Sequence, residues 1–548
     1  MRPGSTPQAD AVTEITTRNP AQKSLHTDRA ACTLRASGEL GIGIPDIKGP
    51  GGHLVVAQAG RQVEQAIADC DPSPWSDDSR VSQLAGKKKS GVARPLVLGA
   101  MASCMLLWVA FYNGYPTVFP DTGGYLYTGA FHIELPPFRA PGYSIFIELT
   151  SLGASAWFTI AIQAIVVVTV LHRTCKYLIG GESGGQSGAE SGCQSKFRDN
   201  CLLAIVCLLA AVTSLPWEAS QLMPDVFAGV VFLSAFLLVF DDQLRLTGRI
   251  ILSAILAISV SSHLSLLPIA TLFAAVLALA TLAGGRLRGV PPAKSTLVWL
   301  LVPIVAAGLW TATLNRRMGL GFRLSASGNE FLLSSLFGKG LAADFLRENC
   351  PKKPFVACRY LSNLPTTPGQ FLFWHPLLHD MAGHEDEMQQ LVRDTIVAHP
   401  VKFVMSSSED TFRQLAAFRT GDEIRETNSL TSNGVVIRQI FAGDSHAYSN
   451  GRQSHRRLNR LANFAAILDT LVFWLSAVAC LVLAWTKRAE KVNVFFYSAI
   501  LFLVINAAIC ATFAGVYDRY QSRVAWLVPF CLMSYICCLV KERKRAIS

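Results

Sequence analysis

Long apolar blocks without charge recur along this chain, and they restrict its fold more than any other feature. Residues 296–314 and 492–513, for example, lack Asp, Glu, Lys and Arg. A helix of about 20 apolar residues crosses a hydrocarbon layer about 30 Å thick. Only 16% of the 548 residues are charged, whereas a soluble protein usually has about 25%. The sequence therefore predicts an all-α polytopic membrane protein.

We expect about ten transmembrane helices. The candidate spans are 94–112, 143–171, 200–214, 224–240, 249–262, 264–284, 296–314, 463–485, 492–513 and 523–540. Segment 143–171 should begin with a short interfacial helix before its span. Ser261, Ser262 and His263 interrupt the pair at 249–284. Such a break inside a membrane is tolerated only where protein or a water-filled cavity receives the freed backbone groups.

The distribution of basic residues predicts the orientation. Lys and Arg gather beside alternate span ends, as at 87–89, 286–294 and 541–545, whereas the short loops of the opposite side hold only Arg139, Arg519 and Arg523. By the positive-inside rule, both termini are cytoplasmic. The net charge of +11 reflects this topology rather than a nucleic-acid partner. We expect a bacterial cytoplasmic (inner) membrane, although the endoplasmic reticulum would give a similar pattern.

The chain divides into four parts. Residues 1–90 are rich in Gly, Ser, Pro and Gln without a sustained period or a signal peptide, which predicts a disordered cytosolic tail. An alternative is that the protein starts nearer Gly86. Residues 91–314 form an N-terminal module of about seven spans, 315–462 a small, mainly helical extracytoplasmic domain, and 463–548 a C-terminal module of about three spans.

The predicted extracytoplasmic loop contains two helices and a cysteine pair. Apolar residues from Met388 to Val397 fall on one helical face, which ends at His399-Pro400, and a second helix is expected over 401–417. Of the 14 cysteines, this topology places only Cys350 and Cys358 in the loop. A local disulfide is predicted because the compartment is oxidising. The alternative is two unpaired thiols.

The first outer loop carries one carboxylate and one guanidinium. Asp121 lies in PDTGGY, and Arg139 follows in R-x-P-G-Y. A carboxylate can take a proton from an incoming hydroxyl or amine, and a guanidinium can hold a phosphate through its fork of donors. The alternative is an ordinary solvated loop, in which Asp121 caps a turn and Arg139 anchors at the headgroups.

Acids also occur in the second outer loop. Glu218 and Asp225 lie in LPWEASQLMPD, between two spans. Acids near lipid are costly to hold without a purpose. Asp225 follows Pro224 at a helix start, so helix capping explains it as well. His263, between two later spans, is either a structural residue or part of a site.

The last outer loop, VYDRYQSRV, contains Arg519 and Arg523 in a very short connection. Two arginines on this side run against the positive-inside tendency. Phosphate or pyrophosphate binding would explain them, and an ion pair between Asp518 and Arg519 would too.

Together these motifs resemble the GT-C superfamily of polytopic membrane glycosyltransferases, which use polyprenyl-phosphate-linked sugars on the non-cytoplasmic face. The resemblance covers residues 94–315 in order and the rest in outline. It rests on Asp121, on R-x-P-x-Y at 139–143, on the acids of the second outer loop and on a large later loop. The chain departs from the protein mannosyltransferases of that superfamily, because its first loop has a single Asp without an Asp-Glu pair.

The resemblance implies an inverting displacement with Asp121 as catalytic base and arginines holding the lipid phosphate. The candidate catalytic residues are Asp121, Glu218 and Asp225, and the candidate substrate- or phosphate-binding residues are Arg139, Tyr143, His263, Arg519 and Arg523. The implied partners are a polyprenyl-phosphate sugar donor, membrane lipid and a glycan, lipid or protein acceptor. No cofactor and no metal ligands are predicted with certainty, but some superfamily members need a divalent cation.

Two other functions fit many spans and a large outer loop. An O-antigen-type polysaccharide polymerase or ligase would place its key residues in that loop, where Arg359 and His375 are the candidates. A lipid-linked sugar flippase or transporter would need a continuous polar path across the bundle. The sequence shows acids mainly at the outer ends of the spans, which favours an enzyme.

Overall fold

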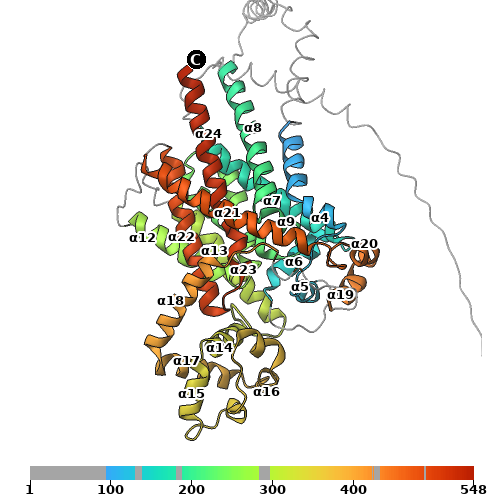
Figure 1. Ribbon diagram of the computed structural model, residues 1–548, viewed down its shortest axis with the longest axis vertical. Helices are drawn as coiled ribbons and strands as arrows, with labels where there is room; N and C mark the ends of the chain where they lie inside the picture. Colours follow the sequence, from blue (N-terminus) through green and yellow to red (C-terminus); the bar gives the residue numbers. More distant parts are fainter. Residues whose placement is uncertain are drawn as a thin grey trace, which may run out of the picture. The chain divides into compact units, whose positions relative to one another are not determined.

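The computed structural model describes residues 94–129, 139–180, 188–282, 296–421, 424, 432–486 and 489–547, which belong to one compact unit (Figure 1). These residues form helices and loops, with one isolated parallel bridge between Thr117 and Gln221. The all-α prediction is therefore confirmed for the described part of the chain. The predicted disordered tail, 1–90, lies outside the described residues.

Five helical segments are long and apolar enough to cross a membrane. They are α7 (Ala156–Ile179), α13 (Thr296–Arg317), α21 (Asn459–Trp485), α22 (Glu490–Phe513) and the continuous segment Asp518–Lys544, which includes α23 (Asp518–Ala525) and most of α24 (Leu527–Ile547). Four shorter apolar helical segments are Arg94–Leu106, Pro224–Phe240, Leu246–Ser261 (α11) and Leu266–Leu282 (α12). These helices indicate a membrane protein, whereas the count of about ten spans stays a prediction.

Helix α10 (Phe227–Phe240) lies at the centre of the bundle, and every one of its residues is buried. A helix that is apolar on all sides is stable only when other helices surround it. Phe232 packs against Phe495 and Phe502 of α22, with ring centroids 5.2 and 5.3 Å apart. At Gly229, an added Cβ would lie 2.3 Å from the Trp526 ring. Glycine therefore lets the start of α24 approach α10 closely.

Two sets of helix ends lie at opposite ends of this bundle. At one end, Arg173 of α7 pairs with Asp241 at 2.6 Å, and Lys541 of α24 donates to the Ile179 carbonyl at 2.6 Å. The other ends of α7, α10 and α24 lead into the connections that contain the predicted site residues. The predicted break between two spans is also present, because α11 ends at Ser261 and α12 begins at Leu266.

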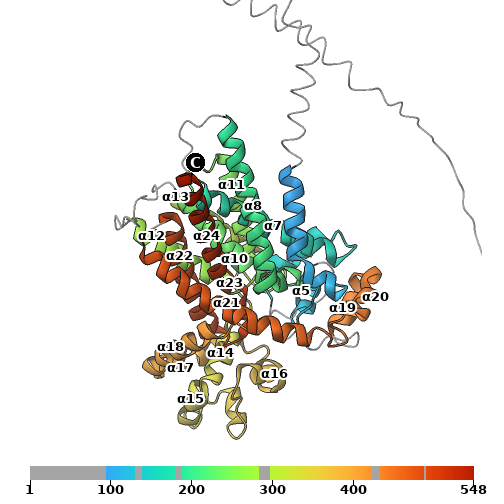
Figure 2. The same cartoon turned by 45° about the horizontal axis from the view of Figure 1, so that its top comes forward.

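The first half of the predicted loop domain has its own apolar core. Its helices are α14 (Gly328–Gly338), α15 (Leu341–Asn349), α16 (Leu377–Asp380) and α17 (Glu385–Ala398). They lie together at the end of the unit opposite the C-terminal part of α24 (Figures 1 and 2). Cys350 and Cys358 form the predicted disulfide, with Cα atoms 5.6 Å apart. The apolar face predicted over Met388 to Val397 is buried at Met388, Leu391 and Val392, whereas Val397, in the last turn of α17, is 72% exposed.

The second half of that loop packs elsewhere. It contains α19 (Ser432–Ile440) and α20 (Ser445–Asn450), which lie beside α5 (Thr122–Gly129) in both views (Figures 1 and 2). Asp444 accepts hydrogen bonds from the Ser155 hydroxyl and the Ala156 amide at the start of α7. The segment 432–458 thus supports the first outer loop, which carries Asp121.

Candidate functional site

Asp121 lies between two arginines that are far apart in the sequence. Its Oδ1 pairs with the Arg139 guanidinium, and its Oδ2 accepts a hydrogen bond from Arg519 Nη1 at 2.9 Å. The Asp121 and Arg519 side chains are each 15% exposed and the Arg139 side chain 14%. The acid–arginine pair that was predicted within the first outer loop is therefore a triad, with its second arginine supplied by α23.

The backbone around Asp121 is held by a residue that the sequence reasoning missed. Asn433 of α19 accepts from the Gly123 amide at 2.7 Å and donates to the Phe119 carbonyl at 2.7 Å. A Cβ at Gly123 would lie only 2.6 Å from Asn433 Oδ1. Glycine at this position therefore allows the close contact, and the fully buried Asn433 fixes the loop on both sides of Asp121.

Arg519 combines an ion pair with aromatic packing. Its guanidinium carbon lies 4.4 Å from the ring centroid of Phe119 and 5.0 Å from that of Tyr520. Within the described part of the chain, its Nε has no hydrogen-bond partner. This Nε is also buried, so its donor is unused among the described residues.

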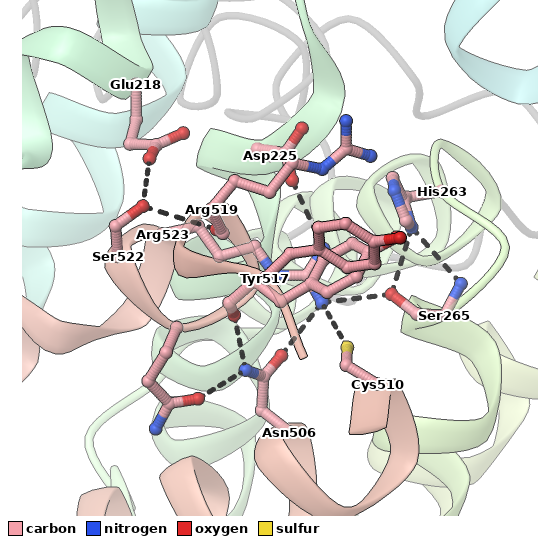
Figure 3. Close-up of polar contacts among 12 residues, drawn as sticks. Glu218, Asp225, His263, Ser265, Asn506, Cys510, Tyr517, Arg519, Ser522 and Arg523 are labelled. Carbon is pink, nitrogen blue, oxygen red and sulfur yellow. Dashed lines mark hydrogen bonds and ion pairs between the residues drawn. The ribbon is translucent and has the colours of Figure 1, made fainter. Parts of the chain in front are cut away.

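Arg523, one turn further along α23, is fully buried and held by several side chains (Figure 3). Nη1 lies 3.3 Å from Asp225, while Nη2 donates to Ser265 at 2.9 Å and to Asn506 at 2.8 Å. Cys510 Sγ is 3.3 Å from the same nitrogen. These contacts join the start of α10, the start of α12 and the end of α22.

Glu218 lies in α9 (Leu215–Ser220) and accepts a hydrogen bond from the Ser522 hydroxyl at 2.8 Å (Figure 3). Ser522 also donates to the Arg519 carbonyl at 3.2 Å. Burial, together with the negative charge of Asp225, raises the pKa of Glu218 to about 8. Glu218 is therefore mainly protonated at neutral pH, whereas Asp225 is paired with a guanidinium.

His263 contacts Ser265, with Nδ1 2.9 Å from the hydroxyl oxygen. Burial and the adjacent Arg523 and Arg519 hold the pKa of His263 well below its usual value. The imidazole is therefore neutral at pH 7. Through Ser265, which also accepts from Arg523, His263 belongs to the same hydrogen-bonded network.

The pKa of Asp121 is set by opposing effects. Burial alone would raise it, but Arg139 and Arg519 outweigh burial and hold the pKa of the carboxyl below its usual value. A carboxylate in this state is a weak base. If an anionic ligand drew either guanidinium away, the pKa of Asp121 would rise, and its basicity with it.

The structure thus brings seven of the eight predicted catalytic and binding residues together at one end of the bundle, in two neighbouring polar groups around Asp121 and Arg523. The exception is Tyr143, whose buried hydroxyl bonds to Gln163 and whose ring packs against Tyr125 with centroids 5.2 Å apart. The residues that sequence reasoning missed are Ser265, Asn433, Asn506 and Ser522. Asn506 alone had a signal in the sequence, because it is a polar residue inside an uncharged apolar block.

Within the described residues, no group of three or more His, Cys, Asp and Glu side chains is arranged to hold a metal ion. The geometry defines a buried network of acids and arginines in an all-helical protein of membrane type. The chain matches no family model, no curated protein and no solved structure.

The raised pKa of Glu218 predicts a pH-dependent stability. The folded protein holds this proton up to a pH of about 8, whereas the unfolded chain releases it near 4.5. The free energy of unfolding therefore falls as pH rises through this interval, by up to about 1.4 kcal/mol per pH unit. Glu218→Gln lacks this contribution. From pH 6 to pH 8 the wild-type protein should therefore lose more unfolding free energy than the variant. Thermal unfolding of both proteins in detergent at the two pH values measures this shift, and an unchanged difference would contradict it.

Proposed function

We propose that this protein is a membrane glycosyltransferase. It transfers a hexose or pentose from a polyprenyl-phosphate-linked donor to an extracytoplasmic glycan, lipid or protein acceptor. The observation that carries the proposal is the triad in which Asp121 lies between Arg139 and Arg519. The three side chains of the triad are 14–15% exposed, and the triad lies at helix ends rather than in the middle of the bundle.

The residues of the triad have the chemistry that such a reaction needs. In the inverting displacement, the acceptor hydroxyl or amine attacks the anomeric carbon, and its proton passes to the Asp121 carboxylate. The bond between the anomeric carbon and the phosphate oxygen breaks, and the polyprenyl phosphate leaves with the electron pair. Arginines stabilise the charge that develops on this oxygen. Because a phosphate is stable as an anion, the leaving group needs no general acid.

Donor binding would also activate the base. Both arginines neutralise Asp121 and hold its pKa low. A donor phosphate would compete for the same guanidinium groups. As an arginine turns towards the phosphate, Asp121 gains basicity. Asp121 would then be an effective base only when a donor is present, which would limit side reactions with water.

Arg523 and Asp225 fit a supporting role in this scheme. Arg523 is fully buried, and Asp225, Ser265 and Asn506 already bind its guanidinium. It is therefore poorly placed to hold a substrate phosphate. We assign it to positioning α23, and with it Arg519, against α10 and α22.

Native mass spectrometry of the detergent-purified protein tests the proposal. We expect a polyprenyl-phosphate sugar to co-purify, to accumulate on Asp121→Asn and to be lost from Arg139→Ala. Because the mass of the bound molecule gives both lipid and sugar, one spectrum identifies the donor. Absence of such a lipid from all three proteins, under conditions that keep ordinary phospholipids bound, would contradict the proposal.

The two other functions have weaker support. In the polymerase or ligase alternative, His375 would act in the outer domain, but its Nε2 lies 2.6 Å from the Asn363 carbonyl and its Nδ1 accepts from the Leu377 amide at 3.1 Å. Both ring nitrogens therefore have local structural contacts. A flippase needs a polar path across the bundle, whereas the network of Asp121 and its neighbours lies at one end of α10, α22 and α24.

A further inference from the structure

Helix α18 (Pro400–Ala416) exposes apolar side chains and buries polar ones, which is the reverse of the pattern in a water-soluble helix. Its exposed apolar side chains are Val401, Val404, Met405 and Phe412, which are between 61% and 73% exposed. Their spacing of three, one and seven residues places them on one face of the helix. The side chains that it buries most completely are Ser407 and Gln414, both polar. In water the opposite arrangement would be stable.

The polar face of α18 is satisfied by protein partners. Asp410 pairs with the buried Lys339 of α14 at 3.0 Å. Gln414 donates to the Tyr517 carbonyl at 2.8 Å and accepts from the Tyr517 amide at 2.9 Å. These contacts fix which face of α18 points towards the protein, so the exposure of the apolar face follows from specific bonds.

Helix α18 packs against a candidate membrane span. Helix α18 packs alongside α22, which is long and apolar enough to cross a membrane. On α22, Val504 and Phe513 are also exposed, at 41% and 44%. An exposed apolar helix face beside a candidate span marks a site of membrane or protein contact.

Charged residues border the apolar face on one side. Lys402, Glu409 and Arg413 follow one another at helical spacing and are more than 60% exposed. A helix with an apolar face next to a charged strip is typical of a helix that lies in the membrane interface, with its charges towards water and headgroups.

We propose that α18 is a lipid-docking helix, whose exposed apolar face lies against phospholipid acyl chains beside α22. The occupant is bilayer lipid, because α18 packs alongside a candidate membrane span and carries a charged strip beside its exposed apolar face, as interfacial helices do. Through Gln414 and Tyr517, this helix is joined to the chain two residues before Arg519. The bilayer would thereby help to hold the arginine loop in place.

Photocrosslinking of the full-length protein in lipid nanodiscs tests this inference. The variants are Phe412→p-benzoylphenylalanine and Met405→p-benzoylphenylalanine, and the nanodiscs contain palmitoyl-oleoyl phosphatidylethanolamine and phosphatidylglycerol. The control places the same photoreactive residue at Arg347 of α15, which is 61% exposed and forms only a surface ion pair. We expect about tenfold more phospholipid adduct at the two α18 positions than at the control position.

Two outcomes would overturn the inference. Equal lipid labelling at all three positions would mean that α18 has no special contact with the bilayer. Crosslinks between two copies of the chain at Phe412, without lipid adducts, would assign the face to a second copy. Two α18 positions are used so that poor folding of one variant, seen as early elution on size exclusion, leaves the other to decide.

Discussion

Replacing Asp121 with asparagine should slow sugar transfer by about a thousandfold, the contribution expected of a positioned general base. Asparagine has nearly the same shape, but it cannot accept the acceptor proton. It also frees the two guanidinium groups from a competing carboxylate, so the donor phosphate should bind at least as tightly as before. The expected result is therefore a loss of turnover with retained or increased donor occupancy.

The measurement is the consumption of the co-purified donor, followed by mass spectrometry after mixing with a membrane extract that supplies acceptors. A matched control is Asp344→Asn, because Asp344 is 45% exposed and pairs with Arg347 on the surface of α15. This variant should consume donor at the wild-type rate. If Asp121→Asn also turned over normally, Asp121 would not be the base, and Glu218 would be the next residue to replace.

The elements of the fold could be predicted from the sequence because helix formation in apolar surroundings is mainly local. The break at Ser261–His263 and the helix break at His399-Pro400 follow from polar residues and proline in otherwise periodic segments. The division of residues 315–462 could not be predicted in this way. Its second half packs against the predicted first outer loop through Asn433 and against the start of α7 through Asp444, and contacts between residues 310 and 289 positions apart leave no local pattern.

The site residues could be predicted where a charged residue type is unfavourable at the position that the expected topology gives it. Acids in loops that are predicted to be short and outer, and arginines on the side predicted to lack them, are unfavourable without partners. In the structure these residues lie close together. The pairing itself could not be predicted. The sequence suggested an ion pair between Asp518 and Arg519, whereas Arg519 binds Asp121 and Asp518 accepts from the Arg419 amide at 3.0 Å. Neighbouring residues on a helix point in different directions, so adjacency in sequence favours no such pair.

Arg519 and Arg523, the two arginines of α23, should contribute differently to stability. Arg523→Ala should lower the free energy of unfolding more than Arg519→Ala does. Asp225 is 3% exposed and Arg523 is fully buried. Removing the guanidinium leaves a buried carboxylate without its counterion, and the expected cost is about 3–5 kcal/mol of unfolding free energy. Ser265 and Asn506 would lose a partner as well. Thermal or denaturant unfolding in detergent, followed by tryptophan fluorescence, measures the loss.

Two further variants separate this structural role from a role in substrate binding. In the double variant Arg523→Met with Asp225→Asn the unpaired charge is removed, so stability should recover in part. Arg519→Ala should cost less than Arg523→Ala, about 1–3 kcal/mol, because Asp121 keeps Arg139 as a counterion although the Arg519 side chain is only 15% exposed. The same variant should bind the donor poorly in native mass spectrometry. If Arg519→Ala destabilised the fold as much as Arg523→Ala while keeping the donor, both arginines would be structural, and Arg139 alone would remain as the phosphate-binding residue.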